Sequence, residues 1–113
     1  MKILEEIKKG EKFADENKEN VYFYFDLDNN TFWYENEDGR ISEILSCSYD
    51  FYFAKNEYEE KRNGVIFFKI KPGKRKSFLL LYLRDNINNF YTIFSDPFLD
   101  VQVLKGEIQF ESI

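Results

Sequence analysis

Residues 21–35 read VYFYFDLDNNTFWYE, and this stretch indicates the fold class of the whole chain. From Val21 to Leu27, every second residue is apolar and the residues between are more polar, which is typical of a half-buried β-strand. The Asp28-Asn29-Asn30 segment favours a tight turn, because Asp and Asn tolerate left-handed backbone conformations. We therefore predict a hairpin whose second strand begins at Thr31.

The rest of the chain continues this pattern of short strands and turns. In Lys71-Pro72-Gly73-Lys74, proline and glycine stand where a type II turn prefers them, so we predict a hairpin of 65–71 with 77–84. The leucine-rich run 79–83 leaves little polar surface and is expected to lie centrally in a sheet. Further strands are predicted at 40–45, 49–54, 90–94, 98–104 and 107–110.

The N-terminal segment has a different period. Residues 2–9 suit a two-turn helix that ends at Gly10, and residues 14–20 suit a polar loop. Residues 55–63 form a charged connector with room for one helical turn. We expect a single mainly β (α+β) domain over residues 1–113, with a short N-terminal helix and about eight antiparallel strands in a curled sheet, barrel or sandwich.

Composition narrows the function classes. The chain has no histidine, which removes the usual His-activated nucleophiles and imidazole metal sites. Cys47 is the single cysteine, so no thiolate zinc site or internal disulfide is expected, and no Gly-rich phosphate loop is present. We predict a protein that is not an enzyme and needs no metal or cofactor. Without an export signal or a long apolar run, it is expected in the cytoplasm of a bacterial host cell.

Charge is divided unevenly along the chain. Residues 1–60 hold sixteen acidic and seven basic residues, whereas residues 61–113 hold five and nine. The acidic half would repel nucleic acid phosphate and attract a basic groove on a protein. We therefore expect a protein partner with a basic surface, and neither direct nucleic-acid binding nor a membrane.

The first hairpin carries the candidate binding residues. Its outward face is expected to combine Tyr22 and Tyr24 with one of two sets from the second strand: residues 32 and 34, or residues 31, 33 and 35. Aromatic and acidic side chains on one sheet face favour protein recognition. The alternative is that the tyrosines only cap the core, with their hydroxyl groups in water. The predicted partner-binding residues are Tyr22, Tyr24, Asp26, Asp28, Trp33, Glu35, Glu37 and Asp38.

Three other groups of residues suggest chemistry less strongly. The first hairpin contains one EF-hand-like spacing, formed by Asp26, Asp28, Asn30, Tyr34 and Glu37. Thr31 stands where that calcium loop needs glycine, so we favour a hairpin turn over a calcium site. A carboxylate pair across the same hairpin would need an apolar pocket to act as acid and base. Cys47 has no neighbouring base in the sequence, so we interpret it as a packed or idle thiol.

A basic cluster surrounds the Pro-Gly turn. It could contact phosphate, an acidic partner or the acidic half of a second copy in a homo-oligomer, or it could be a solvated loop. Its members are Lys69, Lys71, Lys74, Arg75 and Lys76.

The first half of the chain also resembles a known family. The residues concerned are ILEEIKKGEK at 3–12, VYFYF at 21–25, Asp38-Gly39 and Tyr49-Asp50-Phe51. Together they resemble small phage-type domains of the Thoeris anti-defence sponge family. The resemblance implies a short helix followed by an antiparallel sheet, and a protein that sequesters a cyclic nucleotide signal without degrading it.

These lines give one leading hypothesis and two alternatives. The leading hypothesis is a small inhibitor of anti-CRISPR-like, phage-encoded counter-defence type, whose acidic aromatic face occupies a basic groove of a nucleic-acid-processing host protein. The alternatives are a sponge for a small nucleotide signal and a phage structural or assembly protein.

Overall fold

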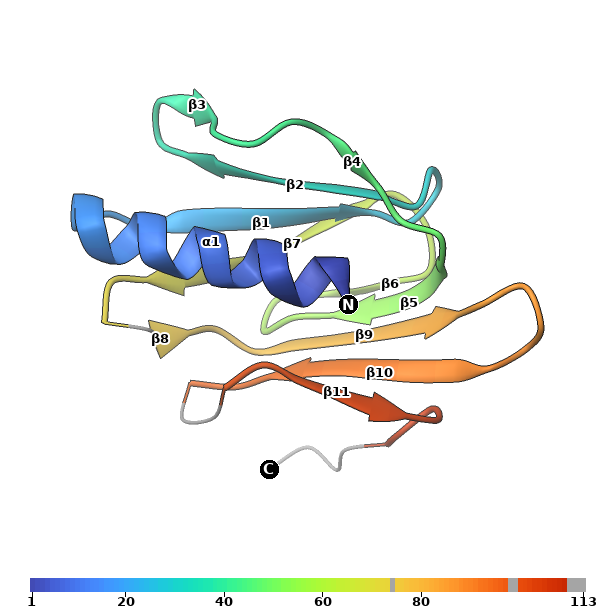
Figure 1. Ribbon diagram of the computed structural model, residues 1–113. Coiled ribbons are helices and arrows are strands. Elements are labelled where there is room, and N and C mark those ends of the chain that lie inside the picture. Colours follow the sequence, from blue (N-terminus) through green and yellow to red (C-terminus); the bar gives the residue numbers. More distant parts are fainter. Residues whose placement is uncertain (74, 98–99, 110–113) are drawn as a thin grey trace.

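The computed structural model describes residues 1–73, 75–97 and 100–109. In this part of the chain one helix is followed by eleven strands, several of them only two residues long (Figure 1). The elements are α1 (Lys2–Asn17), β1 (Val21–Asp26), β2 (Thr31–Asn36), β3 (Gly39–Arg40), β4 (Leu45–Ser46), β5 (Asp50–Lys55), β6 (Glu60–Lys61), β7 (Val65–Lys71), β8 (Arg75–Lys76), β9 (Leu79–Arg84), β10 (Phe90–Ser95) and β11 (Gln102–Lys105).

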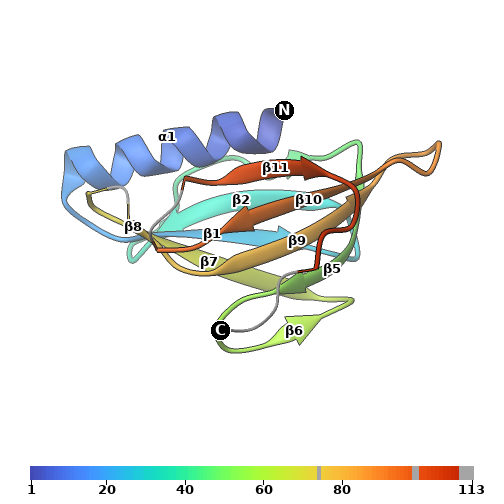
Figure 2. The same cartoon turned by 90° about the horizontal axis from the view of Figure 1, so that it is seen from below.

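The strands form two antiparallel sheets. Sheet A has the order β3-β2-β1-β7-β8, with β4 also paired to β2, and sheet B has the order β11-β10-β9-β5-β6. The mainly β, α+β prediction is therefore confirmed, and the sheets do not close into one barrel. Helix α1 runs along one side of the sheets (Figures 1 and 2) and contacts β1 and β7.

One core lies between the two sheets and the helix. Phe23 is at its centre: its ring centroid lies 5.4 Å from that of Tyr34, 5.9 Å from that of Phe68 and 6.0 Å from that of Phe32. Sheet B contributes leucines from β9, and α1 contributes Ile3, Ile7 and Ala14. Aromatic rings at these separations pack in their preferred offset or tilted arrangements.

The helix is longer than the sequence predicts. It continues through Gly10 and the first four residues of the predicted loop 14–20, and ends at Asn17; Lys18, whose φ is 55°, is its C-cap. Ala14 is fully buried and anchors this added turn. Gly10 is not a helix cap; a Cβ there would lie 3.4 Å from Ile70 Cδ1 and 3.6 Å from Val21 Cγ1, so glycine allows the helix to approach sheet A closely.

The hairpin predicted for 65–84 is shorter than expected. The turn is present, with Gly73 at a φ of 83°, but the strand that follows it and pairs with β7 is the two-residue β8, and the last contact joins Ser77 N–H to Lys69 C=O. The chain then crosses to sheet B, where Leu79–Arg84 pairs with β5 and β10. The buried leucines of β9 need a partner on both faces, which the β7 hairpin cannot provide.

Other strand boundaries also differ. Residues 40–45 form only the ends of β3 and β4, because the N–H groups of Ile41 and Ser42 both bond to Tyr34 C=O and interrupt the ladder. The connector 55–63 contains β6 and no helical turn, and 107–109 is not a strand. Of the predicted strand 98–104, residues 98 and 99 lie outside the described residues, and the strand β11 begins only at Gln102. Residue 110 of the predicted strand 107–110 also lies outside the described residues.

Strand β9 lies in the middle of sheet B with residues 79–83 all buried, as predicted. Its outer face belongs to a second apolar cluster with Phe53 and Phe94. Residues 106–109 run back along this face: Tyr82 Oη donates to Ile108 C=O at 2.7 Å, and Ile108 N–H donates to Thr92 Oγ1 at 2.9 Å. This C-terminal segment therefore contributes to the cover on the outer face of sheet B.

Candidate partner-binding face

The register of sheet A decides which residues share the outer face of the first hairpin. Tyr22 pairs with Glu35 and Tyr24 with Trp33, and directly paired residues of antiparallel strands project to the same side. The alternative set, Phe32 and Tyr34, is buried in the core. The structure thus brings together Tyr22, Tyr24, Trp33 and Glu35 on one partly exposed surface.

Strand β7 extends this surface with residues that the sequence analysis missed. Phe67 pairs with Tyr24 on the other side of β1, and Tyr58 packs over Phe67. The ring centroids are 5.5 Å apart from Trp33 to Tyr24, 5.9 Å from Tyr24 to Phe67 and 6.3 Å from Phe67 to Tyr58. We call these four residues, together with Tyr22, the aromatic strip. Tyr58 is 77% exposed.

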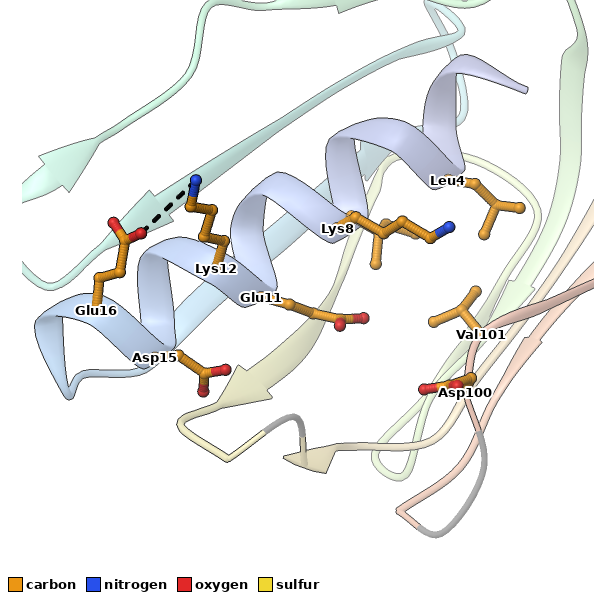
Figure 3. A pocket seen from close by; sticks show the side chains of 9 residues that line it. Leu4, Lys8, Glu11, Lys12, Asp15, Glu16, Asp100 and Val101 are labelled. Carbon is orange, nitrogen blue, oxygen red and sulfur yellow. Dashed lines mark ion pairs between the residues drawn. The ribbon is translucent and has the colours of Figure 1, made fainter.

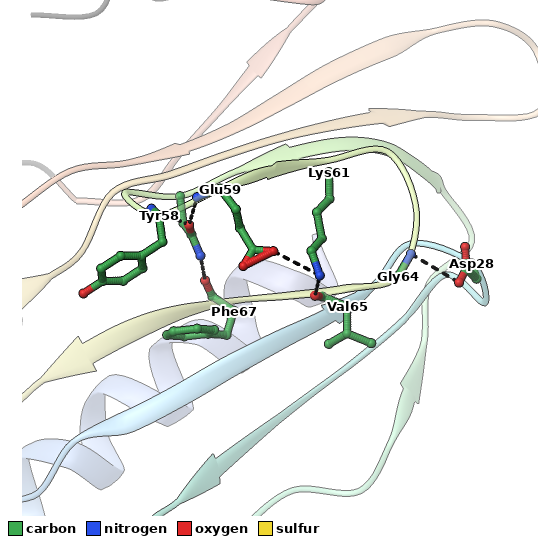
Figure 4. A network of polar contacts seen from close by, with 8 residues as sticks. Asp28, Tyr58, Glu59, Lys61, Gly64, Val65 and Phe67 are labelled. Carbon is green, nitrogen blue, oxygen red and sulfur yellow. Dashed lines mark hydrogen bonds and ion pairs between the residues drawn. The ribbon is translucent and has the colours of Figure 1, made fainter.

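Asn56 holds Tyr58 beside the sheet (Figure 4). Asn56 is only 3% exposed, and its Nδ2 donates to Phe67 C=O at 2.7 Å. Its Oδ1 accepts from the N–H groups of Tyr58 at 2.8 Å and Glu59 at 3.0 Å. One amide therefore fixes the turn that carries Tyr58 and bonds to the edge of β7.

Further polar contacts secure the same edge (Figure 4). Lys61 Nζ donates to Val65 C=O at 3.0 Å and pairs with Glu59 at 3.0 Å. Gly64 N–H donates to Asp28 Oδ2 at 3.2 Å, which ties the β6–β7 connection to the turn of the first hairpin. Side chains thus satisfy backbone groups of β7 that no neighbouring strand reaches.

Glu35 is placed against the aromatic strip. Trp33 Nε1 donates to Glu35 Oε2 at 2.8 Å, along the same strand. Burial raises the pKa of Tyr24, and the negative charge of Glu35 raises it further. The carboxylate therefore acts electrostatically on the centre of the strip, and Tyr24 stays a neutral hydrogen-bonding group at physiological pH.

The other predicted acidic residues lie at the ends of the hairpin. Asp26 projects from the same face, but its carboxylate accepts from the N–H groups of Asp28 at 3.0 Å and Asn29 at 3.2 Å, and from Asn29 Nδ2 at 2.9 Å. The hydrogen bond from the Asn29 side chain, aided by these N–H groups, lowers the pKa of Asp26. Glu37 and Asp38 are exposed in the β2–β3 turn. Asp26 therefore stabilises the turn, and carboxylates lie at both ends of the first hairpin.

The EF-hand-like residues do not converge. Tyr34 points into the core, and Glu37 lies at the far end of β2 from the Asp28 turn. No group of three or more His, Cys, Asp or Glu side chains within the described ranges is placed to hold a metal ion. The turn interpretation accounts for the Asp and Asn residues here.

The basic cluster is divided by the fold. Lys69 Nζ lies 5.8 Å from the centroid of the Tyr22 ring, whereas the Lys76 side chain is 2% exposed and Nζ lies 3.4 Å from Glu11 Oε1. Arg75 is exposed in β8, and Lys74 lies outside the described residues. Lysines that are neighbours in sequence therefore have different structural roles.

A cleft lies on another side of the molecule. It is an open cleft of about 630 Å³ between α1 and the segment that leads into β11 (Figure 3). Lys12 and Glu16 form an ion pair across 3.8 Å at its rim. The cleft is lined by Leu4, Ile7, Lys8, Glu11, Lys12, Asp15, Glu16, Asp100 and Val101.

Cys47 is half-buried between β4 and β5, and its Sγ accepts from Tyr49 N–H at 3.4 Å. Burial raises the pKa of its thiol. A thiol with a raised pKa is a poor nucleophile near neutral pH, which agrees with the interpretation of Cys47 as a packed residue.

Comparison of the chain with protein-family models, with curated proteins and with solved structures finds no match. Among the described residues, no helix has the length and apolar character needed to cross a membrane. Inferences about function therefore depend on the geometry of the chain itself.

Proposed function

We propose that this chain is a non-catalytic binding protein that uses the outer face of sheet A to dock onto a protein partner with a basic surface. The observation that carries the proposal is the aromatic strip, a row of partly exposed rings that leads from Trp33 to the highly exposed Tyr58. Tryptophan and tyrosine dominate the binding energy of protein interfaces, because they bury much area at little cost in conformational entropy.

The surroundings of the strip indicate the charge of the partner. Carboxylates border it at both ends of the first hairpin and beside Tyr58, with fewer cations among them. Charges at the rim of an interface orient the approaching partner and speed its association, and a charge of the same sign as the partner's placed there repels it. The acidic residues at the rim are Asp26, Asp28, Glu37, Asp38, Glu57 and Glu59, and the cations are Arg40, Lys61 and Lys69.

The biological role that best fits this face is inhibition by occlusion. A protein that processes nucleic acid carries a basic groove that binds phosphate. An acidic, aromatic surface on a second protein can occupy that groove in place of the nucleic acid. We propose a phage-encoded counter-defence inhibitor of this kind, acting in the host cytoplasm. The nucleotide-sponge alternative has less support, because the open cleft beside α1 is lined by four carboxylates and two lysines and would repel phosphate.

The test is retention of a partner by the immobilised chain, at low and moderate salt. The rim variant Glu37→Lys with Asp38→Lys changes exposed side chains at one end of the first hairpin, and Tyr58→Ala removes an exposed ring. Both are expected to lose a basic nucleic-acid-processing protein that the unchanged chain retains. Equal retention by all variants would contradict the proposal.

The matched control reverses two exposed carboxylates on α1, Glu5→Lys with Glu16→Lys, which lie on the helix that covers the inner face of sheet A. It changes the net charge by the same amount as the rim variant. If the rim variant and the control lost the partner equally, the partner would be attracted by net charge alone, and a defined binding face would be excluded. The oligomeric state measured alongside tests the assembly-protein alternative, which requires concentration-dependent self-association.

A further inference from the structure

The chain itself shows how an arginine binds to a ring and a carboxylate on one strand. Arg84 of β9 donates from Nη2 to Asp50 Oδ2 at 2.6 Å, and its guanidinium carbon lies 5.3 Å from the centroid of the Tyr52 ring. Asp50 and Tyr52 are two residues apart on β5, so one guanidinium reaches both. This geometry combines a charge-assisted hydrogen bond with a cation–π contact.

Strand β2 carries a similar pair, in the reverse order along the strand, on the outer face of sheet A. Trp33 and Glu35 are also two residues apart, and the 2.8 Å hydrogen bond from Nε1 to Oε2 holds the carboxylate beside the indole. Tyr24 stacks against Trp33 with an interplanar angle of 13°. The hydrogen bond and the stacking together fix the positions of both groups before any ligand arrives, which lowers the cost of binding.

In the described part of the chain, this second pair has no cation of its own. The cation–π contacts found there place Arg62 over Phe53, Arg84 over Tyr52 and Lys69 over Tyr22, and none over Trp33. Arg40 stands opposite Glu35 in the register, but its side chain is exposed and no ion pair within 4.0 Å joins the two in the described ranges.

We propose that Trp33 and Glu35 form a binding position for the guanidinium group of an arginine on the partner protein. This inference rests on the proposed function and specifies the chemistry by which the face recognises its partner. A guanidinium is planar and weakly hydrated, so it can stack on the indole and still donate to the carboxylate; a lysine ammonium is compact and strongly hydrated. The binding position should therefore prefer arginine to lysine.

The position carries its own reporter, because Trp33 is the only tryptophan of the chain. Capped tetra-arginine and tetra-lysine peptides are titrated at low salt, and the Trp33 emission is followed up to about 1 mM peptide, where weak binding is still resolved. The expected result is a saturable change with the arginine peptide and an affinity at least about threefold weaker for the lysine peptide.

Two variants of equal charge change locate the effect. Glu35→Gln is expected to weaken binding of the arginine peptide about fivefold, the scale of one exposed ion pair. Glu5→Gln, on the helix at the other side of sheet A, is expected to leave the affinity within about 1.5-fold, since remote surface charges contribute little. Equal affinities for Glu35→Gln and the unchanged chain would overturn the proposal. An affinity for the lysine peptide equal to that for the arginine peptide would also overturn it.

The same titration is made with the Arg40→Ala variant, in which the chain's own arginine opposite Glu35 can no longer occupy the binding position. Absence of any Trp33 response in both the unchanged chain and Arg40→Ala would overturn the proposal. The proposed function would survive that result if the rim and Tyr58 variants still lost a retained partner, because the retention assay does not depend on arginine peptides.

Discussion

Asn56 allows a direct test of how the aromatic strip is built. Replacing it by alanine removes three hydrogen bonds of 2.7, 2.8 and 3.0 Å, and leaves the carbonyl of Phe67 and the N–H groups of Tyr58 and Glu59 without their partner. At about 1 kcal/mol for each net hydrogen bond, Asn56→Ala should lower the free energy of unfolding by about 3 kcal/mol. For a domain of this size, the melting temperature should fall by roughly 10 to 15 °C.

The assay is urea unfolding followed by the emission of Trp33, with thermal unfolding as a second measurement. Asn86→Ala is the matched control: Asn86 is exposed in the β9–β10 connection, so its change should stay within about 0.5 kcal/mol. A loss below about 1 kcal/mol for Asn56→Ala would refute the reasoning, because such a value fits an exposed amide with weak contacts. Retention of the partner should fall together with stability, since the same amide positions Tyr58.

Three further predictions concern titrating groups. The raised pKa of Cys47 leaves little thiolate at pH 8, so iodoacetamide should alkylate the folded chain at least about tenfold more slowly than the urea-unfolded chain; equal rates would contradict its burial. Burial, and then the hydrogen bond to Glu107, raise the pKa of Tyr52 in the folded state. The free energy of unfolding should therefore fall as pH rises above 10, and it should fall less steeply in Tyr52→Phe. If the free energy of unfolding depended on pH identically in both proteins between pH 8 and 10.5, this contribution of Tyr52 would be excluded. The pKa of Asp26 is lowered, mainly by the hydrogen bond from the Asn29 side chain, so the ionised Asp26 contributes to folding stability above the ordinary pKa of 3.8, and this contribution is lost as pH falls through the folded-state pKa. The urea midpoint should therefore change less between pH 5 and 2.5 in Asp26→Asn than in the unchanged chain. The same pH profile in both would count against the turn contact.

Local patterns in the sequence account for the parts of the fold that local chemistry determines. Alternation places Phe23 and Phe25 inside and Tyr22 and Tyr24 outside, and the Pro72-Gly73 turn forms as predicted. The continuous leucines of β9 indicate a strand buried on both faces, which the structure confirms. In each case the signal lies within a few residues of the element that it predicts.

Contacts between distant segments account for the errors. The end of α1 depends on Ala14 being buried against the sheets, and Gly10 serves close packing on Ile70, which is 60 residues away. In the candidate site, the sequence identified the outward residues of one hairpin but not Phe67 and Tyr58. Those join the strip only because β7 pairs with β1, and no local pattern encodes that pairing.

The outer faces of the two sheets differ in how far their aromatic side chains are exposed, and this difference supports a binding role for sheet A. On sheet B, Phe53, Leu80, Tyr82 and Phe94 are each at most 9% exposed. On sheet A, the rings of the aromatic strip remain partly exposed, up to 77% for Tyr58. A chain that can cover one aromatic face with its own segments has the means to cover another. Contiguous aromatic surface left in water on a small domain is therefore better explained by a partner than by the needs of folding.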